Sequence, residues 1–113
     1  MNIQRFDTGP RMSQAVVHNG FVFLAGQVGS GATVAEQTKE ILASIDALLA
    51  RAGSDKTKIL TATIWLADIS TFNEMNPVWE AWMPAGHAPA RATVESKLAG
   101  PQYLVEIGII AAA

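Results

Sequence analysis

One long amphipathic segment constrains the fold more than any other part of the sequence. Between residues 34 and 52, core-type side chains recur at spacings of three, four and seven residues. These side chains are Val34, Thr38, Ile41, Leu42, Ile45, Leu48, Leu49 and Ala52. The period predicts an α-helix with one apolar face. Thr33 is suited to cap its start, Glu36 stands where a capping box needs an acid, and Gly53 is suited to end it.

Short runs of β-branched and apolar residues predict the strands against which this helix packs. Residues 15–18 and 21–25 flank Asn19-Gly20, the strongest two-residue hairpin signal, because a type I′ turn needs positive φ at both positions. Further strands are predicted at 59–66, 90–95 and 103–111, with a weaker signal for an edge strand at 3–6. Residues 26–32 (GQVGSGA) are predicted to form a flexible loop after the hairpin.

A second, shorter helix is predicted near residues 77–82. Asn76 is suited to be its N-cap and Pro77 its first residue, because proline inside a helix costs about 3 kcal/mol. The resulting order, β-β-β-α-β-α-β-β, is typical of an α+β fold in which two helices pack on one face of a mostly antiparallel sheet. We expect a single domain over residues 1–113.

The shortage of charged residues predicts an oligomer. Only 16% of the residues are charged and 50% are hydrophobic, whereas an average domain is about 25% charged. We therefore expect the second face of the sheet to be buried against another subunit. The net charge of −2 and the absence of a basic block disfavour binding to nucleic acid.

Several other classes of site and location are also disfavoured. The absence of cysteine excludes disulfides, thiolate zinc sites and cysteine nucleophiles. His18 and His87 each lack a second ligand at metal spacing, so no metal site is expected. The N-terminal segment MNIQRFDTGPRMSQ lacks the apolar core of a signal peptide, and no apolar run has the roughly twenty residues of a membrane helix. We expect a cytoplasmic protein.

Arg91 is the one full cation in the apolar stretch HAPARATVE. Strand alternation places it on one face with Thr93 and Glu95, and places Ala92 and Val94 on the other. This face could be exposed to solvent, could hold a structural ion pair, or could bind a ligand. The ligand reading rests on the planar fork of arginine, which binds a carboxylate through two parallel hydrogen bonds.

Glu106 is the matching anomaly in YLVEIGIIAAA, where it is the only charge. We expect its carboxylate to be partly desolvated, as suits proton transfer near neutral pH, and Gly108 leaves space beside it. The alternatives are a salt bridge with Arg91 across neighbouring strands or a strand edge open to water. Gly26 and Gln27 end an apolar strand, where a backbone can approach a ligand and an amide offers both donor and acceptor, unless they only form a turn.

The motifs GPRMSQAV, FLAGQVG, MNPVWEAW, APARATVE and VEIGIIA, in this order, resemble the Rid family of imine/enamine deaminases, also called YjgF. The resemblance covers essentially the whole chain. It implies a chorismate-mutase-like α+β fold and a homotrimer whose sheets line a central barrel, with clefts between subunits. It also implies hydrolysis of 2-imino or 2-enamino acids to 2-keto acids and ammonia, with no cofactor.

The resemblance also implies roles for particular residues. Arg91 matches the arginine that holds the substrate carboxylate, and Glu106 the glutamate that positions or activates water. The remaining matches are Gly26 and Gln27 as pocket-lining residues, Asn76 as the asparagine of the second helix, and Thr93 as a residue whose backbone lies near the reacting nitrogen. Met12 stands where many members have a tyrosine that reaches the ligand of a neighbouring subunit, so either substrate preference or rate is expected to differ.

Two other functions stay open at the level of sequence. The chain could be a non-catalytic trimer that binds small carboxylates or acts like a chaperone, because Arg91 would serve binding equally well. RNA cleavage, an old label for the family, is disfavoured by the acidic balance and the lack of a histidine pair.

Overall fold

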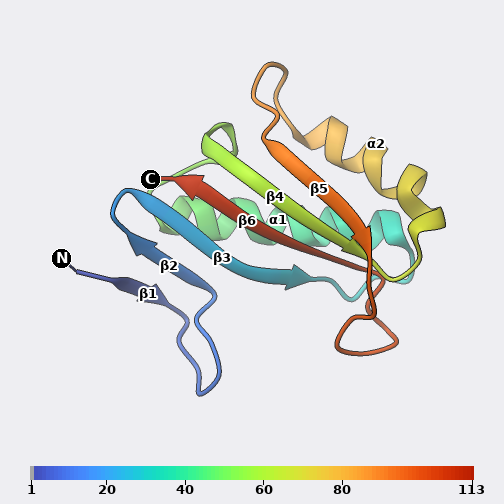
Figure 1. The fold of residues 1–113 in the computed structure, drawn as a ribbon, viewed down its shortest axis with the longest axis horizontal. Coiled ribbons are helices and arrows are strands. Elements are labelled where there is room, and N and C mark those ends of the chain that lie inside the picture. Colours follow the sequence, from blue (N-terminus) through green and yellow to red (C-terminus); the bar gives the residue numbers. More distant parts are fainter. Residues whose placement is uncertain (1) are drawn as a thin grey trace.

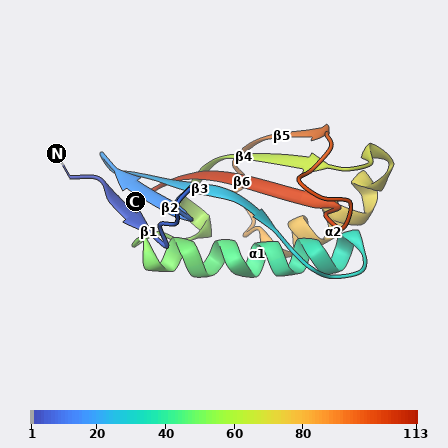
Figure 2. The ribbon, with the colours of Figure 1, turned by 90° about the horizontal axis from the view of Figure 1, so that it is seen from below.

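The computed structural model describes residues 2–113, which form a six-stranded sheet and two α-helices. The strands are β1 (Gln4–Phe6), β2 (Ala15–His18), β3 (Phe21–Val28), β4 (Ile59–Leu66), β5 (Ala90–Glu95) and β6 (Val105–Ala112). The helices are α1 (Val34–Arg51) and α2 (Phe72–Trp82), and short 3₁₀ turns, η1 (Lys56–Lys58) and η2 (Ile69–Thr71), precede β4 and α2. Figure 1 shows α1 behind the sheet and α2 beside the β5 edge, and Figure 2 shows α1 and the end of α2 on one side of the sheet. The α+β fold with two helices on one face is confirmed.

The strand order in the sheet is β1-β2-β3-β6-β4-β5. Four neighbouring pairs are antiparallel, and β4 with β5 is parallel. Parallel neighbours need a crossover connection, which α2 supplies between β4 and β5. The last two strands of the chain are therefore separated by β4, and the prediction that Arg91 and Glu106 lie on neighbouring strands is wrong.

The boundaries of α1 follow from its capping residues. The Thr33 hydroxyl accepts a hydrogen bond from the Glu36 N–H at 3.1 Å, and the Glu36 carboxylate accepts one from the Ala32 N–H at 2.9 Å. At the other end Gly53 has a φ of 80°, the left-handed conformation that commonly ends a helix. The predicted start and stop are confirmed to within one residue. Within residues 2–113, neither helix is long and apolar enough to cross a membrane.

The β2–β3 hairpin forms as predicted. Asn19 and Gly20 have φ values of 57° and 80°, as a type I′ turn requires. However, β3 continues through Gly26 and Gln27 to Val28, so the prediction of a flexible loop from residue 26 is wrong. The reason is pairing with β6, which extends to Val28 opposite Glu106 after a bulge between Leu24 and Gln27.

The core lies between the sheet and the helices. It combines the inward side chains of β3, β4 and β6 with the apolar face of α1 and with Met75 and Trp79 of α2. Within the part of the chain that the structure describes, no helix covers the opposite side of the sheet, which we call the open face (Figure 2). Large apolar side chains lie exposed on this face, including Phe21, Phe23 and Val94, which are 44%, 42% and 45% exposed.

One salt bridge ties the loop between β1 and β2 to the end of α1. Arg51 donates to both oxygens of Asp7, at 2.7 and 3.2 Å, and its guanidinium carbon lies 5.4 Å from the centroid of the Phe6 ring. The hydrogen bond with Arg51 holds the pKa of Asp7 below its usual range. Arg51 thus has both an aromatic contact and a carboxylate partner within the chain.

Candidate functional site

Arg91 lies on the helix-facing side of β5. Its neighbour in the sheet is the buried Ala62 of β4, and its guanidinium carbon lies 5.9 Å from the ring centroid of Phe72 and 5.5 Å from that of Trp79. Burial lowers the pKa of Arg91, and the carboxylate of Glu80 acts in the opposite direction. Within residues 2–113, the guanidinium makes neither a hydrogen bond nor a salt bridge. Of the three alternatives for Arg91, a structural ion pair is therefore excluded within the described chain.

Asn76 and Thr93 lie beside Arg91 and carry unpaired polar atoms. The Asn76 Oδ1 and Thr93 Oγ1 atoms are buried and have no hydrogen-bond partner among the described residues, although buried polar atoms are nearly always paired. Asn76 is one helical turn from both Phe72 and Trp79, which places it on the same side of α2. Thr93 follows Arg91 on the same face of β5. We call Arg91, Asn76 and Thr93 the arginine cluster.

The role predicted for Asn76 at the start of the second helix is wrong. The helix begins at Phe72, four residues earlier, and both Asn76 and Pro77 lie inside it. The preceding 3₁₀ turn, which Asp68 caps by accepting from the Ser70 N–H at 2.9 Å, leads directly into α2 and sets its start. Because Asn76 lies one turn from Phe72 and Trp79, it is on the side of α2 that faces Arg91. A capping residue would lie at the end of the helix.

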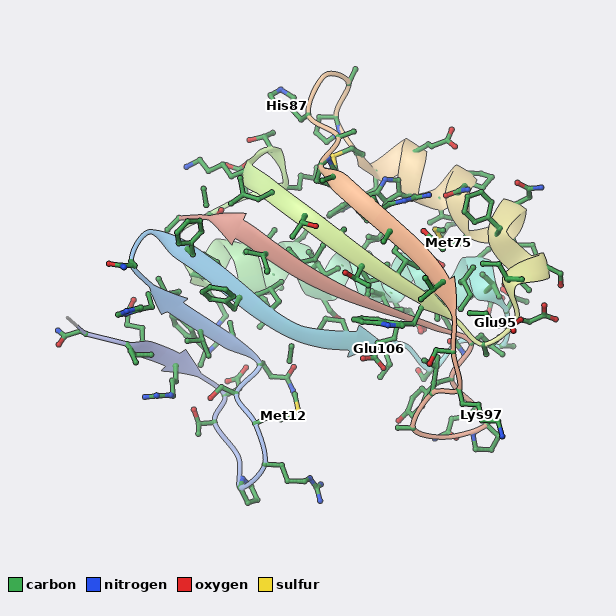
Figure 3. All side chains as sticks on the ribbon, viewed as in Figure 1. Met12, Met75, His87, Glu95, Lys97 and Glu106 are labelled. Carbon is green, nitrogen blue, oxygen red and sulfur yellow. The ribbon has the colours of Figure 1, made fainter. Side chains whose placement is uncertain are left out.

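Glu106 lies on the open face, on the opposite side of the sheet from the arginine cluster. Its side chain alternates with the buried Val105 and Ile107, and Figure 3 shows it near the end of β3. A β-carbon at Gly26 would overlap the Glu106 carboxylate, so this carboxylate occupies the space that a side chain at residue 26 would need. The absence of a side chain at Gly26 thus leaves room for the Glu106 carboxylate. Gly26 lies within strand β3 and does not form a turn.

Trp65 is a functional candidate that the sequence motifs did not indicate. It is the antiparallel neighbour of Glu106 on the open face, and its six-membered ring lies over Gly108, 3.2 Å from where a β-carbon would stand. The space that Gly108 provides is therefore filled by the Trp65 indole. The alternation of Trp65 with the buried Ile64 and Leu66 is the signal that could have placed it on this face.

Gln27 and Met12 belong to the same end of the sheet as Glu106. The Gln27 amide donates to Gln14 Oε1 at 2.9 Å and to the Ala25 carbonyl at 3.0 Å, so its donor groups are used within the chain. The Ala25 N–H also donates to the Gln14 carbonyl, which holds the β1–β2 loop against β3. Met12 is 47% exposed on that loop, and Figure 3 shows it at the end of the sheet where Glu106 lies.

The residues singled out in the sequence therefore form two groups within one chain. The arginine cluster faces α2, whereas Gly26 and Glu106 share the open face with Trp65. A salt bridge between Arg91 and Glu106 within one chain is excluded, because β4 separates their strands and their side chains lie on opposite faces. Within residues 2–113, no three His, Asp or Glu side chains lie together in a way that could hold a metal ion.

Comparison with known proteins shows to which family the chain belongs. A family model described as Endoribonuclease L-PSP matches residues 2–113. The RutC family protein YoaB of Escherichia coli strain K12 is 48% identical over 113 residues, which cover 99% of each chain. The chain belongs to the Rid/YjgF family. The resemblance seen in its motifs is thereby confirmed.

Solved structures of the Rid/YjgF family share the fold over the whole chain. NMB1025 of Neisseria meningitidis, described as a member of the YjgF family, is 52% identical with a TM-score of 0.97, and the match covers 99% of this chain and 95% of that one. Rv2704 of Mycobacterium tuberculosis, from the same family, is 28% identical with a TM-score of 0.93, and the match covers 99% and 100%. The names of these relatives identify the family and no substrate.

Proposed function

We propose that this protein hydrolyses 2-imino and 2-enamino acids to 2-keto acids and ammonia, at sites between the subunits of a homotrimer. The observation that carries the proposal is the state of Arg91. Its guanidinium is half-buried beside two aromatic rings, with no hydrogen-bond partner in the described chain. A substrate carboxylate has the charge and planar geometry that this fork binds.

The arginine cluster supports recognition of more than a carboxylate. The buried Oδ1 atom of Asn76 can accept a hydrogen bond, and the Thr93 hydroxyl can both donate and accept. A 2-imino acid carries a polar nitrogen one bond beyond the carbon that bears its carboxylate. Unpaired polar atoms near the guanidinium suit such a ligand better than a simple fatty acid, whose chain offers no polar partner.

Glu106 would supply the proton transfers. Water adds to the carbon of the protonated C=N group, and Glu106 takes the proton that this water releases. The same carboxyl group then returns this proton to the nitrogen, which leaves as ammonia while the C=O bond of the keto acid forms. The proton of the hydroxyl group passes through Glu106 to the departing ammonia, which is released as ammonium. One water is consumed, and no oxidant or reductant is needed.

The opposite orientation of the two groups favours a site shared between subunits. One small substrate cannot contact Arg91 and Glu106 of the same sheet, because they lie on opposite faces with β4 between them. Arg91 of one subunit and Glu106 of another can meet across an interface. The exposed phenylalanines of the open face support such an interface, because a large exposed apolar surface is commonly a contact surface.

The proposal is tested by generating an imino acid in situ with an amino-acid oxidase and trapping the remainder with semicarbazide. The wild-type protein should accelerate hydrolysis and lower the yield of semicarbazone. Arg91→Ala should lower kcat/KM by at least about thirtyfold, because a charged hydrogen-bonded pair is lost, and Arg91→Lys should restore little because lysine lacks the fork. No acceleration by the wild type, or equal acceleration by Arg91→Ala, would contradict the proposal.

A second candidate is a trimer that binds small carboxylates without chemistry. The free fork of Arg91 favours it, since binding alone requires no Glu106. Glu106→Gln distinguishes the two functions. Lost turnover with retained binding of a 2-keto acid supports the deaminase, whereas a wild type that binds keto acids without turnover supports the binding protein.

A further inference from the structure

Arg91 is held by aromatic contacts on α2. Phe72 and Trp79 are seven residues apart, about two helical turns, so their rings project from the same side of the helix. The guanidinium carbon lies within 6 Å of both ring centroids, which is the range of a cation–π contact. Two aromatic rings from successive turns of α2 thus hold the Arg91 side chain of β5.

Comparison with Arg51 shows what is unusual about this arrangement. Arg51 also lies against an aromatic ring, that of Phe6, but its fork is occupied by both oxygens of Asp7. Arg91 has two rings and no carboxylate within 4 Å among residues 2–113. Aromatic faces attract the cation but accept none of its N–H donors in ordinary hydrogen bonds, so the fork of Arg91 stays available.

The exposure of Phe72 points in the same direction. Trp79 is 5% exposed and belongs to the core, whereas Phe72 is 38% exposed and is not one of the buried core residues. A phenylalanine at an exposed helix position adds little to the core. Packing in the core therefore does not account for Phe72, whereas its contact with Arg91 gives it a role.

We infer that Phe72, together with Trp79, is a positioning residue that holds the Arg91 guanidinium ready for a substrate carboxylate. The inference rests on the proposed function, because it assumes that Arg91 binds the carboxylate. A confined arginine loses less conformational freedom when it binds than a mobile one does. Phe72 therefore acts on substrate binding through Arg91, and not on the later proton transfers.

The test compares Phe72→Leu with Phe72→Tyr, which keeps the ring. Phe6→Leu is the matched control, because the Phe6 ring contacts Arg51 as the Phe72 ring contacts Arg91, but it lies on β1, at the opposite edge of the sheet from β5. For each variant we would measure kcat and KM for an imino acid, the Kd of 2-oxobutanoate, the melting temperature, and the order of the Arg91 Nε–H group by ¹⁵N relaxation.

Phe72→Leu should raise KM and the Kd of 2-oxobutanoate by about three- to tenfold, as expected for loss of a cation–π contact. Its kcat should stay within about twofold, and the Arg91 Nε–H group should become more mobile. Phe72→Tyr should resemble the wild type, and Phe6→Leu should keep the KM, the Kd of 2-oxobutanoate and the order of the Arg91 Nε–H group. An unchanged Kd and an unchanged Arg91 order in Phe72→Leu would overturn the inference, as would a loss of kcat that only follows the melting temperature.

The same measurements separate this inference from the proposed function. If the wild type binds 2-oxobutanoate but does not hydrolyse imino acids, the proposed deaminase activity is excluded. The role of Phe72 is then decided by the Kd of 2-oxobutanoate and by the order of the Arg91 Nε–H group. A wild type that binds no keto acid would overturn both.

Discussion

Gly26 and Glu106 occupy one small space on the open face of the sheet. A β-carbon at residue 26 would overlap the Glu106 carboxylate and would press on its γ-methylene group. We predict that Gly26→Ala displaces this carboxylate and lowers kcat by at least about tenfold, because complete loss of a general acid or base costs about a hundredfold or more and displacement causes part of that loss. Steady-state rates with an imino acid, together with keto-acid binding, measure the effect, and binding through Arg91 should change little.

Gly9→Ala is the control for this prediction. A β-carbon at Gly9, in the loop between β1 and β2, would meet only the Met12 carbonyl, at an ordinary 3.8 Å. Its activity and melting temperature should match those of the wild type. If Gly26→Ala kept full kcat, Glu106 would not depend on the space at residue 26, and its role in proton transfer would be in doubt.

Single-residue patterns predicted which side chains share a face but not what lies opposite them. Arg91, Thr93 and Glu95 do share a face, and Glu106 alternates with buried residues as predicted. The order of strands in the sheet was not available from these patterns, because alternation is a local property and the pairing of β4 with both β5 and β6 is not. The separation of Arg91 from Glu106 could therefore be seen only in the fold.

At the scale of elements, α2 contains a proline in its interior. Pro77 is the sixth residue of α2, so the Asn73 carbonyl lacks the N–H that would normally bond to it. We predict that Pro77→Ala raises the free energy of unfolding by about 1–2 kcal/mol, the helix penalty of proline less its benefit in restricting the unfolded chain. Urea unfolding at one fixed protein concentration measures this change.

Pro10→Ala provides the comparison for Pro77→Ala. Pro10 is exposed in the loop between β1 and β2, where no helix is interrupted. Its replacement should leave stability unchanged or lower it slightly, because only the restriction of the unfolded chain is lost. A Pro77→Ala variant no more stable than Pro10→Ala would show that α2 has already adapted to its proline.

The elements were predicted best where capping chemistry and hydrophobic period agreed. Both signals marked α1, and its cap at Thr33 and stop at Gly53 were confirmed. For α2 the usual rule for proline pointed to a start at Pro77, whereas a 3₁₀ turn capped by Asp68 starts the helix at Phe72. The rule failed because contacts with α1 and the core hold the helix together despite the missing hydrogen bond.

At the scale of the whole molecule, the proposed site requires two chains. We predict that Arg91→Ala and Glu106→Gln, each inactive alone, recover activity when unfolded and refolded together. In randomly mixed trimers from equal amounts, about a quarter of the interfaces would combine an intact Arg91 with an intact Glu106. Recovery of about a quarter of the wild-type rate, measured after mixing, would support a shared site.

Two outcomes would contradict this arrangement. If light scattering gives the mass of a monomer, the interface does not form in solution. Mixed variants that form trimers but recover no activity would mean that Arg91 and Glu106 do not serve one substrate from different subunits. Refolding each variant with wild-type protein controls for damage during the procedure.

The placement of Arg91 and Glu106 on opposite faces of one sheet has a consequence for regulation by dilution. A lone chain has a complete core and both chemical groups, and yet under the proposed function it has no complete site. Its rate per chain would then fall as the concentration drops through the range in which the trimer dissociates. A cell holding little of this protein would clear reactive imines less well than its number of chains suggests.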